Sequence, residues 1–257
     1  MPEVPLPGGS VTCVPEVPLP GGSVTPVYRA GDTVRRAPGA RSGYVHRLLG
    51  LLERSGWPGA PRFLGLDARG REVLSFVPGH VAWEPDQPAE IGSDQSLAGV
   101  AGLVREFHDL TAGTQLAGDA EVACHNDLSP RNTVYRDDGT GLRPAAFIDW
   151  DLAAPGQRIH DVAHVCWQYL GLGGGIVAGP AARGIALVCD AYGLAGRHRV
   201  VDAILWWQDR CWRGIAAGAA AGDPAMAGLR DAGAVREVQS AYRWVAAHRR
   251  ELAAGRV

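Results

Sequence analysis

Residues 124–135 read CHNDLSPRNTVY, and this stretch carries most of what the sequence says about structure and chemistry. It contains a histidine, an aspartate two residues later and an asparagine five residues after that, namely His125, Asp127 and Asn132. The chain has only two asparagines, and both lie in this stretch. The spacing is therefore more informative than a chance match of common residue types.

A hairpin of two strands is predicted directly after this loop. Short apolar runs at 133–136 and 145–148 are separated by the turn-forming residues DDGTG. Because a hairpin brings its two ends together, we expect Asp149, in FIDWD, to lie beside Asn132. Carboxylate and amide oxygens are ligands that Mg²⁺ prefers. The sequence therefore predicts a magnesium site with Asn132 and Asp149 as ligands.

Asp127 is then free to face an acceptor hydroxyl. Phosphoryl transfer from ATP needs metal ions on the phosphates and a carboxylate that orients the hydroxyl and accepts its proton. The spacing His-x-Asp-x-x-x-x-Asn is that of a kinase catalytic loop. Taken alone, His125 is better explained as a buried, hydrogen-bonded histidine, and the ordinary alternative for Asp127 is a helix or turn cap.

These motifs resemble those of the aminoglycoside phosphotransferase family, bacterial relatives of protein and choline kinases. The resemblance runs from about Gly21 to the last helix, and its specific part is 122–165. It implies that Asp127 is the catalytic base, that His125 organises the loop, and that ATP and Mg²⁺ are the cofactors. The same resemblance implies that Asn132 and Asp149 hold Mg²⁺.

Two further acids follow the metal-binding aspartate in DWDLAAPGQRIHDVAH. The resemblance implies that Asp161, at the start of a helix, braces the catalytic loop. We interpret Asp151 as an exposed acid after a strand, with a second metal ion as the alternative.

The nucleotide side is predicted from a glycine-containing bend between two strands. Gly21, Gly22 and Ser23 lie where the family's phosphate loop would be, and backbone N–H groups there can approach phosphates. The chain has 25 arginines and no lysine, so an arginine must replace the lysine that usually contacts the phosphates. Strand alternation points only one arginine of TVRR toward the cleft. Alignment with the family's strand implies that this is Arg36 rather than Arg35.

The acid that usually pairs with this cation is not evident on the helix predicted at 43–55. His46 occupies the expected place, and Glu53 is interpreted as a solvated acid. The run LSFVPG at 74–79 resembles the hinge whose backbone holds adenine, with candidate contacts Ser75, Phe76 and Val77.

We expect an α+β, protein-kinase-like fold of two lobes. A 13-residue unit occurs twice, at 2–14 and 15–27, and residues 1–20 are expected to be a loose N-terminal arm. Residues 21–79 form the strand-rich, nucleotide-binding lobe, with a tight turn at 30–32 and a hairpin of 62–66 with 72–77. Residues 80–257 form the mainly helical lobe, with helices opened by Ser93 or Asp94 and at 158–170, 181–193, 199–218 and 234–253. Only 133–136 and 145–148 are expected as strands there.

Composition excludes several classes of function. The 257 residues carry a formal net charge of −2, whereas nucleic-acid binding needs a strong basic excess. We see no apolar run of about 18 residues and no secretory leader, and so expect a cytoplasmic protein without a membrane span. Five scattered cysteines without a C-x-x-C pair suggest neither a disulfide framework nor a thiolate metal site.

The predicted function is ATP-dependent transfer of the γ-phosphate to a hydroxyl of a small molecule, with aminoglycosides or other antibiotics as the family's usual acceptors. Residues 151–257 contain 12 arginines and nine acids, which disfavours a polycationic acceptor unless Asp202, Asp209 and Asp223 cluster. One alternative is a kinase-fold binding or immunity protein that sequesters a toxic small molecule or peptide. Another is a zinc hydrolase that uses His160 and His164, which lie one helical turn apart.

Overall fold

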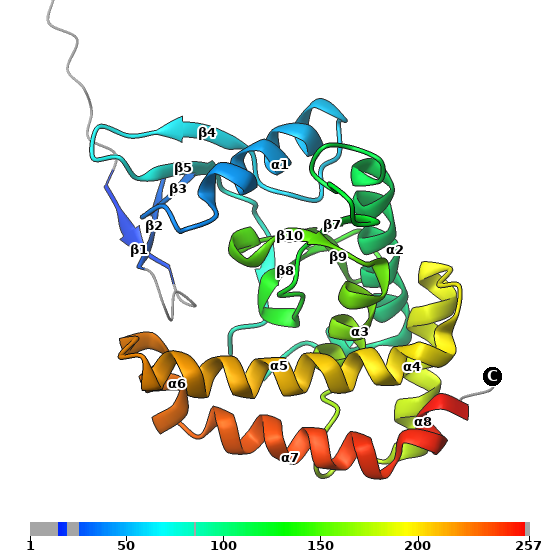
Figure 1. The fold of residues 1–257 in the computed structure, drawn as a ribbon. Helices are drawn as coiled ribbons and strands as arrows, with labels where there is room; N and C mark the ends of the chain where they lie inside the picture. Colours follow the sequence, from blue (N-terminus) through cyan, green and yellow to red (C-terminus); the bar gives the residue numbers. More distant parts are fainter. Residues whose placement is uncertain (1–14, 20–25, 85, 255–257) are drawn as a thin grey trace, which may run out of the picture.

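The N-terminal lobe is an antiparallel sheet packed beside one helix (Figure 1). The computed structural model describes residues 15–19, 26–84 and 86–254. In that part of the chain the strand order is β1-β2-β3-β5-β4. The strands are β1 (Val17–Pro18), β2 (Val27–Ala30), β3 (Thr33–Arg36), β4 (Phe63–Leu66) and β5 (Glu72–Ser75). The predicted tight turn and hairpin are both present.

Helix α1 (Ser42–Arg54) connects β3 to β4 and covers the lobe's interior. Four of its apolar residues, at helical spacing, are buried, namely Val45, Leu48, Leu49 and Leu52. Strand β1 belongs to the second copy of the duplicated unit and pairs with β2. The first copy lies outside the described residues, as does the segment 20–25 that joins β1 to β2.

The chain passes to a second sheet within four residues. Strand β5 ends at Ser75, and β6 (His80–Val81) starts a three-stranded sheet of order β6-β8-β9 with β8 (Thr133–Asp137) and β9 (Leu142–Phe147). Gly79, just before β6, has φ 150°, and a Cβ there would lie 2.4 Å from Val134 Cγ1. Only glycine fits this close approach.

The C-terminal lobe is mainly helical (Figure 1). Its first helix, α2 (Asp94–Thr111), is capped by Ser93, whose hydroxyl accepts a hydrogen bond from the Ser96 N–H at 3.1 Å. The remaining helices are α3 (Arg158–Tyr169), α4 (Ala178–Tyr192), α5 (Val200–Ala220), α6 (Pro224–Asp231), α7 (Ala234–Ala247) and α8 (Arg249–Ala254). Short 3-10 helices span Ala89–Gly92, Pro130–Asn132, Trp150–Leu152 and Arg197–Arg199.

This lobe differs from the prediction in three respects. The helix expected at 234–253 is divided into α7 and α8, and α6 was not expected. Three short strands were also missed: β6, β7 (Val122–Cys124) and β10 (Ala154–Gly156). Strands of two or three residues are too short to show alternation, so only their tertiary pairing reveals them. No helix in the described ranges is both long and apolar enough to cross a bilayer.

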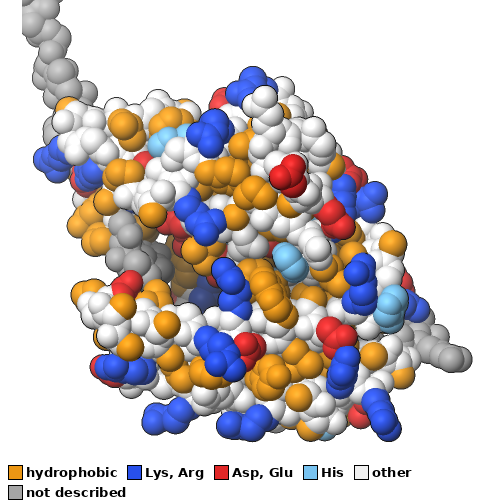
Figure 2. Space-filling model, viewed as in Figure 1, with side chains coloured by type: hydrophobic (Ala, Val, Ile, Leu, Met, Phe, Trp, Pro, Cys, Tyr) orange, Lys and Arg blue, Asp and Glu red, His pale blue; other side chains and the backbone are white. Residues whose placement is uncertain are grey.

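The outer helices carry charges of both signs. Figure 2 shows basic and acidic side chains interspersed over the face formed by α5 and α7, with apolar side chains between them. No single-sign patch covers this face of the molecule.

One aromatic cluster joins the two lobes. The ring of Phe107 in α2 lies 5.2 Å from Trp150, 5.9 Å from Trp57 and 6.1 Å from Phe147, measured between centroids. Trp57 follows α1 in the N-terminal lobe, and its indole N–H donates to Glu106 in α2 at 2.8 Å. The apolar core is therefore continuous across both lobes.

Replacing Phe107 by alanine should lower the free energy of unfolding by about 3–5 kcal/mol, because the ring is fully buried and its removal leaves a cavity between the lobes. Urea titration followed by tryptophan fluorescence measures this loss. Leu64→Ala on the exposed edge of β4 is the control and should change stability by less than about 0.5 kcal/mol. Equal losses in the two variants would contradict this view of the core.

Candidate active site

A small sheet brings the two motif segments together. Strand β7 pairs antiparallel with β10, with Cys124 opposite Ala154. The loop that starts at His125 therefore lies beside Ala153, at the end of the segment that contains Asp149. The predicted β8–β9 hairpin is also present, and beyond its first pair the Ile148 N–H donates to the Asn132 carbonyl at 2.9 Å.

Asp161, in the first turn of α3, holds the start of the loop. Its carboxylate accepts the backbone N–H groups of His125 at 2.7 Å and Asn126 at 2.9 Å, and His108 Nε2 at 3.0 Å. Burial disfavours the charged form, but these donors keep the pKa of Asp161 below its usual value. The contact implied by the family resemblance is therefore present, and it stabilises Asn126 at φ 66°, an unfavourable angle for most residues.

The buried ring of His125 is held as one tautomer. Nε2 lies 3.1 Å from the Ile148 carbonyl, which only accepts, and Nδ1 lies 3.3 Å from the backbone N–H of Asp127, which only donates. Burial lowers the pKa of His125, which keeps the ring neutral. His125 thus links the loop to β9 and has the satisfied hydrogen bonds of a structural histidine.

Asp127 and Asn132 are in direct contact across the loop. The Asn132 amide donates to the Asp127 carbonyl and to Asp127 Oδ2, both at 2.8 Å. Burial and the neighbouring charge of Asp149 raise the pKa of Asp127 to about 7, although the Asn132 hydrogen bond opposes this shift. A carboxylate of this pKa is suited to accept a proton near neutral pH.

Asp149 lies just beyond the hairpin in a left-handed conformation, with φ 62° and ψ 62°. Its side chain is 48% exposed, so a ligand can reach its oxygens. Asn132 donates through its amide nitrogen, which leaves the amide oxygen free of these contacts. This half-exposed carboxylate and the amide oxygen suit a Mg²⁺ ion that retains water or phosphate ligands.

Arg36 reaches this site from the N-terminal lobe. Its Nη1 lies 3.3 Å from Asp149 Oδ1, and its Nη2 bonds to Asp151 Oδ1. The side chain is buried, and the acids around it raise its pKa despite burial, so the guanidinium stays charged. Arg35 Nη1, by contrast, lies 3.4 Å from Oε1 of Glu16, the residue before β1. Arg36 is thus the arginine of this pair that contacts the motif acids.

The acid that pairs with Arg36 was missed from the sequence. Glu72, in β5, lies opposite Arg36 in the strand register and accepts from its Nε at 2.9 Å. Glu53 lies 3.6 Å from Arg62 at the surface, consistent with its interpretation as a solvated acid. Asp151, expected as an exposed acid after a strand, is 43% exposed, and it also bonds to Arg36, which the sequence did not indicate. The available signal for Glu72 was its position, because it is an acid at the start of a strand that pairs with β3.

The predicted hinge residues face different directions. The Ser75 hydroxyl accepts the Arg62 N–H at 2.8 Å, and the Phe76 N–H donates to the Asp32 carbonyl at 2.8 Å. The Phe76 ring lies under the Arg29 guanidinium at 3.8 Å. In the described part of the chain, the N–H of Val77 has no hydrogen-bond partner. Gly21, Gly22 and Ser23 lie outside the described residues.

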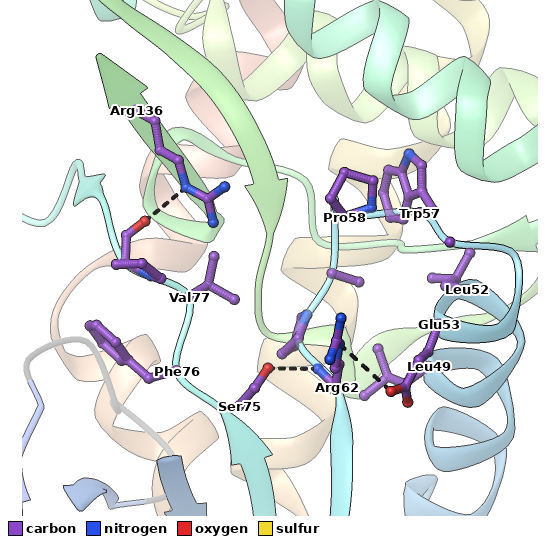
Figure 3. A pocket seen from close by; sticks show the side chains of 14 residues that line it. Leu49, Leu52, Glu53, Trp57, Pro58, Arg62, Ser75, Phe76, Val77 and Arg136 are labelled. Atoms are coloured by element: carbon purple, nitrogen blue, oxygen red, sulfur yellow. Dashed lines mark hydrogen bonds and ion pairs between the residues drawn. The ribbon is translucent and has the colours of Figure 1, made fainter. Parts of the chain in front are cut away.

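A separate cavity of about 230 Å³ lies between the hinge segment and the end of α1 (Figure 3). It is lined by Leu49, Leu52, Trp57 and Phe76 among others, and the Glu53–Arg62 pair lies at its wall. Its lining includes none of the motif residues of the catalytic loop. The lining does include Ser75, Phe76 and Val77, the predicted adenine contacts, so this cavity borders the hinge rather than the catalytic loop.

The two histidines proposed for zinc are engaged elsewhere. His164 is buried and its Nδ1 bonds to the Leu128 carbonyl at 2.9 Å, while His160 Nδ1 accepts the Gln157 N–H at 3.4 Å. In the described residues, neither belongs to a group of three possible metal-ligating side chains. The group that does exist, His108, Cys124 and Asp161, has its His and Asp atoms in the hydrogen bonds that hold the loop.

Comparison with known sequences identifies the class. Residues 94–200 match the phosphotransferase enzyme family. A trifolitoxin immunity protein from Rhizobium leguminosarum bv. trifolii is 31% identical over 204 residues, which span 67% of this chain and 72% of that protein. The chain belongs to the phosphotransferase enzyme family.

Solved structures share the fold. Ethanolamine kinase from Plasmodium vivax matches with a TM-score of 0.62 at 11% identity, over 92% of this chain and 83% of that one. An aminoglycoside phosphotransferase from Streptomyces rimosus matches with a TM-score of 0.55 at 17% identity, over 74% of this chain and 91% of that one. The predicted protein-kinase-like fold of two lobes is thereby confirmed.

Replacing Asp161 by alanine should cost at least about 3 kcal/mol of unfolding free energy, because it leaves two backbone N–H groups and His108 without their acceptor in a buried site. Chemical denaturation measures the loss. Asp190→Ala is the control, since Asp190 and Arg197 form a half-exposed pair at 2.8 Å that should contribute under about 1 kcal/mol. A loss no larger than that of the control would show that Asp161 does not hold the loop.

Proposed function

We propose that this protein transfers the γ-phosphate of ATP to a hydroxyl group of a small molecule, with Mg²⁺ as cofactor. The observation that carries the proposal is the convergence of Asp127, Asn132 and Asp149 with Arg36 from the other lobe. Family membership and the fold support a phosphotransferase. Structures that share the fold are complexes with GDP or with ADP and streptomycin, which supports nucleotide use.

Each residue has a role that its contacts support. Asp127 Oδ2 is held by Asn132, so Oδ1 is free to accept the proton of the attacking hydroxyl. The hydroxyl oxygen forms a bond to the γ-phosphorus while the bond to the bridging oxygen of ADP breaks. When bound by Asn132 and Asp149, Mg²⁺ supplies positive charge to the phosphate oxygens. Arg36 adds a fixed cation that can bond phosphate oxygens with its two Nη groups.

The nucleotide base has a candidate contact in the hinge. The N–H of Val77, which has no partner among the described residues, is suited to bond an adenine ring nitrogen, whereas the N–H of Phe76 is already used. We infer the phosphate loop at Gly21–Ser23 from the family resemblance alone. Because the proposed reaction consumes ATP, which the cytoplasm supplies, we also propose a cytoplasmic location.

The charge of the helical lobe argues against a polycationic acceptor. Asp202 bonds to Arg249, Asp209 bonds to Arg213 at 2.8 Å, and Asp223 caps α6. These three acids were the candidates for a cluster, but each is neutralised or used locally. We therefore favour neutral or anionic hydroxyl compounds as acceptors over aminoglycosides.

An immunity function without turnover is the second candidate. It is favoured by the relative named for immunity to trifolitoxin, which is 31% identical to this chain. A protein of this kind would bind a toxic molecule at the same site without transferring phosphate. Immunity and catalysis are also compatible, since phosphorylation of a toxin can inactivate it.

ATP consumption with Mg²⁺ tests the first candidate. The purified protein should consume ATP with at least one member of a panel that contains aminoglycosides, other hydroxylated antibiotics, choline, homoserine, sugars and trifolitoxin. Activity should disappear with EDTA and return with Mg²⁺, because oxygen ligands suit this ion, and a zinc-selective chelator should have no effect. Inhibition by the zinc chelator alone would instead support the hydrolase alternative.

Asp127→Asn should lower turnover about 10²–10⁴-fold with the fold and ADP binding intact, because it removes the proton acceptor but keeps the shape. Asp138→Asn in the half-exposed β8–β9 turn is the matched control and should be as active as the wild type. Unchanged turnover in Asp127→Asn would contradict the assigned base. If cells expressing Asp127→Asn stay protected from the toxic molecule, the protein sequesters that molecule rather than modifying it.

A further inference from the structure

Glu72 is a buried acid at the edge of the site. Its side chain is 1% exposed and lies opposite Arg36 in the pairing of β3 with β5. Glu72 Oε2 accepts from Arg36 Nε at 2.9 Å, while Oε1 accepts from the Ser42 hydroxyl and from His46 Nε2 at 2.7 Å. A buried carboxylate needs such donors, and all of them come from the N-terminal lobe. No ligand can reach Glu72 directly.

We propose that Glu72 is a positioning residue that fixes the Arg36 guanidinium by its Nε edge, and that α1 holds Glu72 in place through His46 and Ser42. This inference rests on the proposed function. This arrangement differs from the usual one in kinases, in which a strand lysine pairs with a glutamate of the helix. Here the helix contributes the donors, and the acid stands on the neighbouring strand.

The shape of arginine makes this division of contacts possible. The guanidinium is planar and has donors on several edges, so one edge can be anchored while the others bind elsewhere. Nε is held by Glu72, while Nη1 and Nη2 face Asp149 and Asp151. On nucleotide binding, the two Nη groups can exchange carboxylate oxygens for phosphate oxygens while Nε keeps its contact. A lysine ammonium has no second edge to anchor.

Helix α1 provides a rigid support for this anchor. The His46 ring is stacked on Phe63 of β4, with centroids 3.6 Å apart and planes 12° apart. Ser42 is the first residue of α1. Phe63 lies in β4, the strand paired with β5, so β4 supports the His46 ring that bonds to the Glu72 carboxylate.

Removal of the Glu72 charge changes nucleotide affinity in opposite directions under a positioning role and under simple electrostatics. Three carboxylates surround one guanidinium, so a phosphate group that enters the site meets excess negative charge. Electrostatics alone predicts that removal of the Glu72 charge strengthens nucleotide binding. Positioning predicts the opposite, because an unanchored Arg36 turns onto Asp149 and Asp151 and is lost to the phosphates.

The test is equilibrium binding of ADP with Mg²⁺, measured by calorimetry, which needs no acceptor. Glu72→Gln should raise the Kd for ADP about 10-fold, because the charge-assisted hydrogen bond to Arg36 is lost or replaced by a weaker neutral one. In the ATP-consumption assay the same variant should raise the KM for ATP more than it lowers kcat. Glu53→Gln, which changes the acid of α1 that pairs with Arg62 at the surface, is the control and should leave Kd unchanged.

His46→Leu tests the link to α1. It should raise the Kd for ADP by a smaller factor, about threefold, because Glu72 keeps its contacts with Arg36 and Ser42. The double variant should bind ADP no more weakly than Glu72→Gln alone, since both changes act through one side chain. Effects that add fully in the double variant would overturn the proposed link.

Other outcomes separate this inference from the proposed function. Wild-type binding that Glu72→Gln leaves unchanged or strengthens would overturn the positioning role and leave the phosphotransferase proposal standing. Absence of ADP binding by the wild-type protein would overturn the proposed function and this inference together. Thermal unfolding shows whether Glu72→Gln folds; if it does not, an unchanged Kd in His46→Leu overturns the inference.

Discussion

At the site, the ion pairs of a single arginine link the two lobes. Arg36 ends β3 in one lobe and contacts Asp149 and Asp151 of the other, while Glu72 pairs with it inside its own sheet. Arg36 is 8% exposed, and a buried charge is tolerated only with counter-charges and hydrogen bonds around it. The relative placement of the motif acids and the N-terminal sheet therefore depends on this group. Because the chain lacks lysine, the contact has the geometry of a planar fork.

The other half of the site is fixed by backbone contacts. The pairing of β7 with β10 sets both motif segments side by side, and Asp161 binds two successive N–H groups at the start of the loop. His125 then ties the loop to the end of β9. Phosphoryl transfer relies on positioning and on charges arranged before the reaction, so rigidity in these supports matters as much as the reactive groups.

The fold alone leaves the acceptor open. Kinases of ethanolamine and of aminoglycosides share this architecture with the chain, and a relative with 31% identity is named for immunity to a toxin. One fold can host different functions, so the shared architecture does not identify an acceptor. In this chain the acids of α5 are occupied by Arg249 and Arg213, which distinguishes its helical surface from one built for a polycation.

The sequence by itself determined the secondary structure around the motifs, the arrangement in two lobes and the convergence of Asp127, Asn132 and Asp149, because loop spacing and a hairpin are local properties of the chain. Strand alternation allowed only one of Arg35 and Arg36 to face the cleft, and the resemblance to the family's strand singled out Arg36. Only the tertiary structure decided that Glu72 is the partner of Arg36, that Asp151 contacts the same group, and that the strands β7 and β10 pair. These contacts join residues far apart in sequence, and no local period or spacing specifies which buried groups meet.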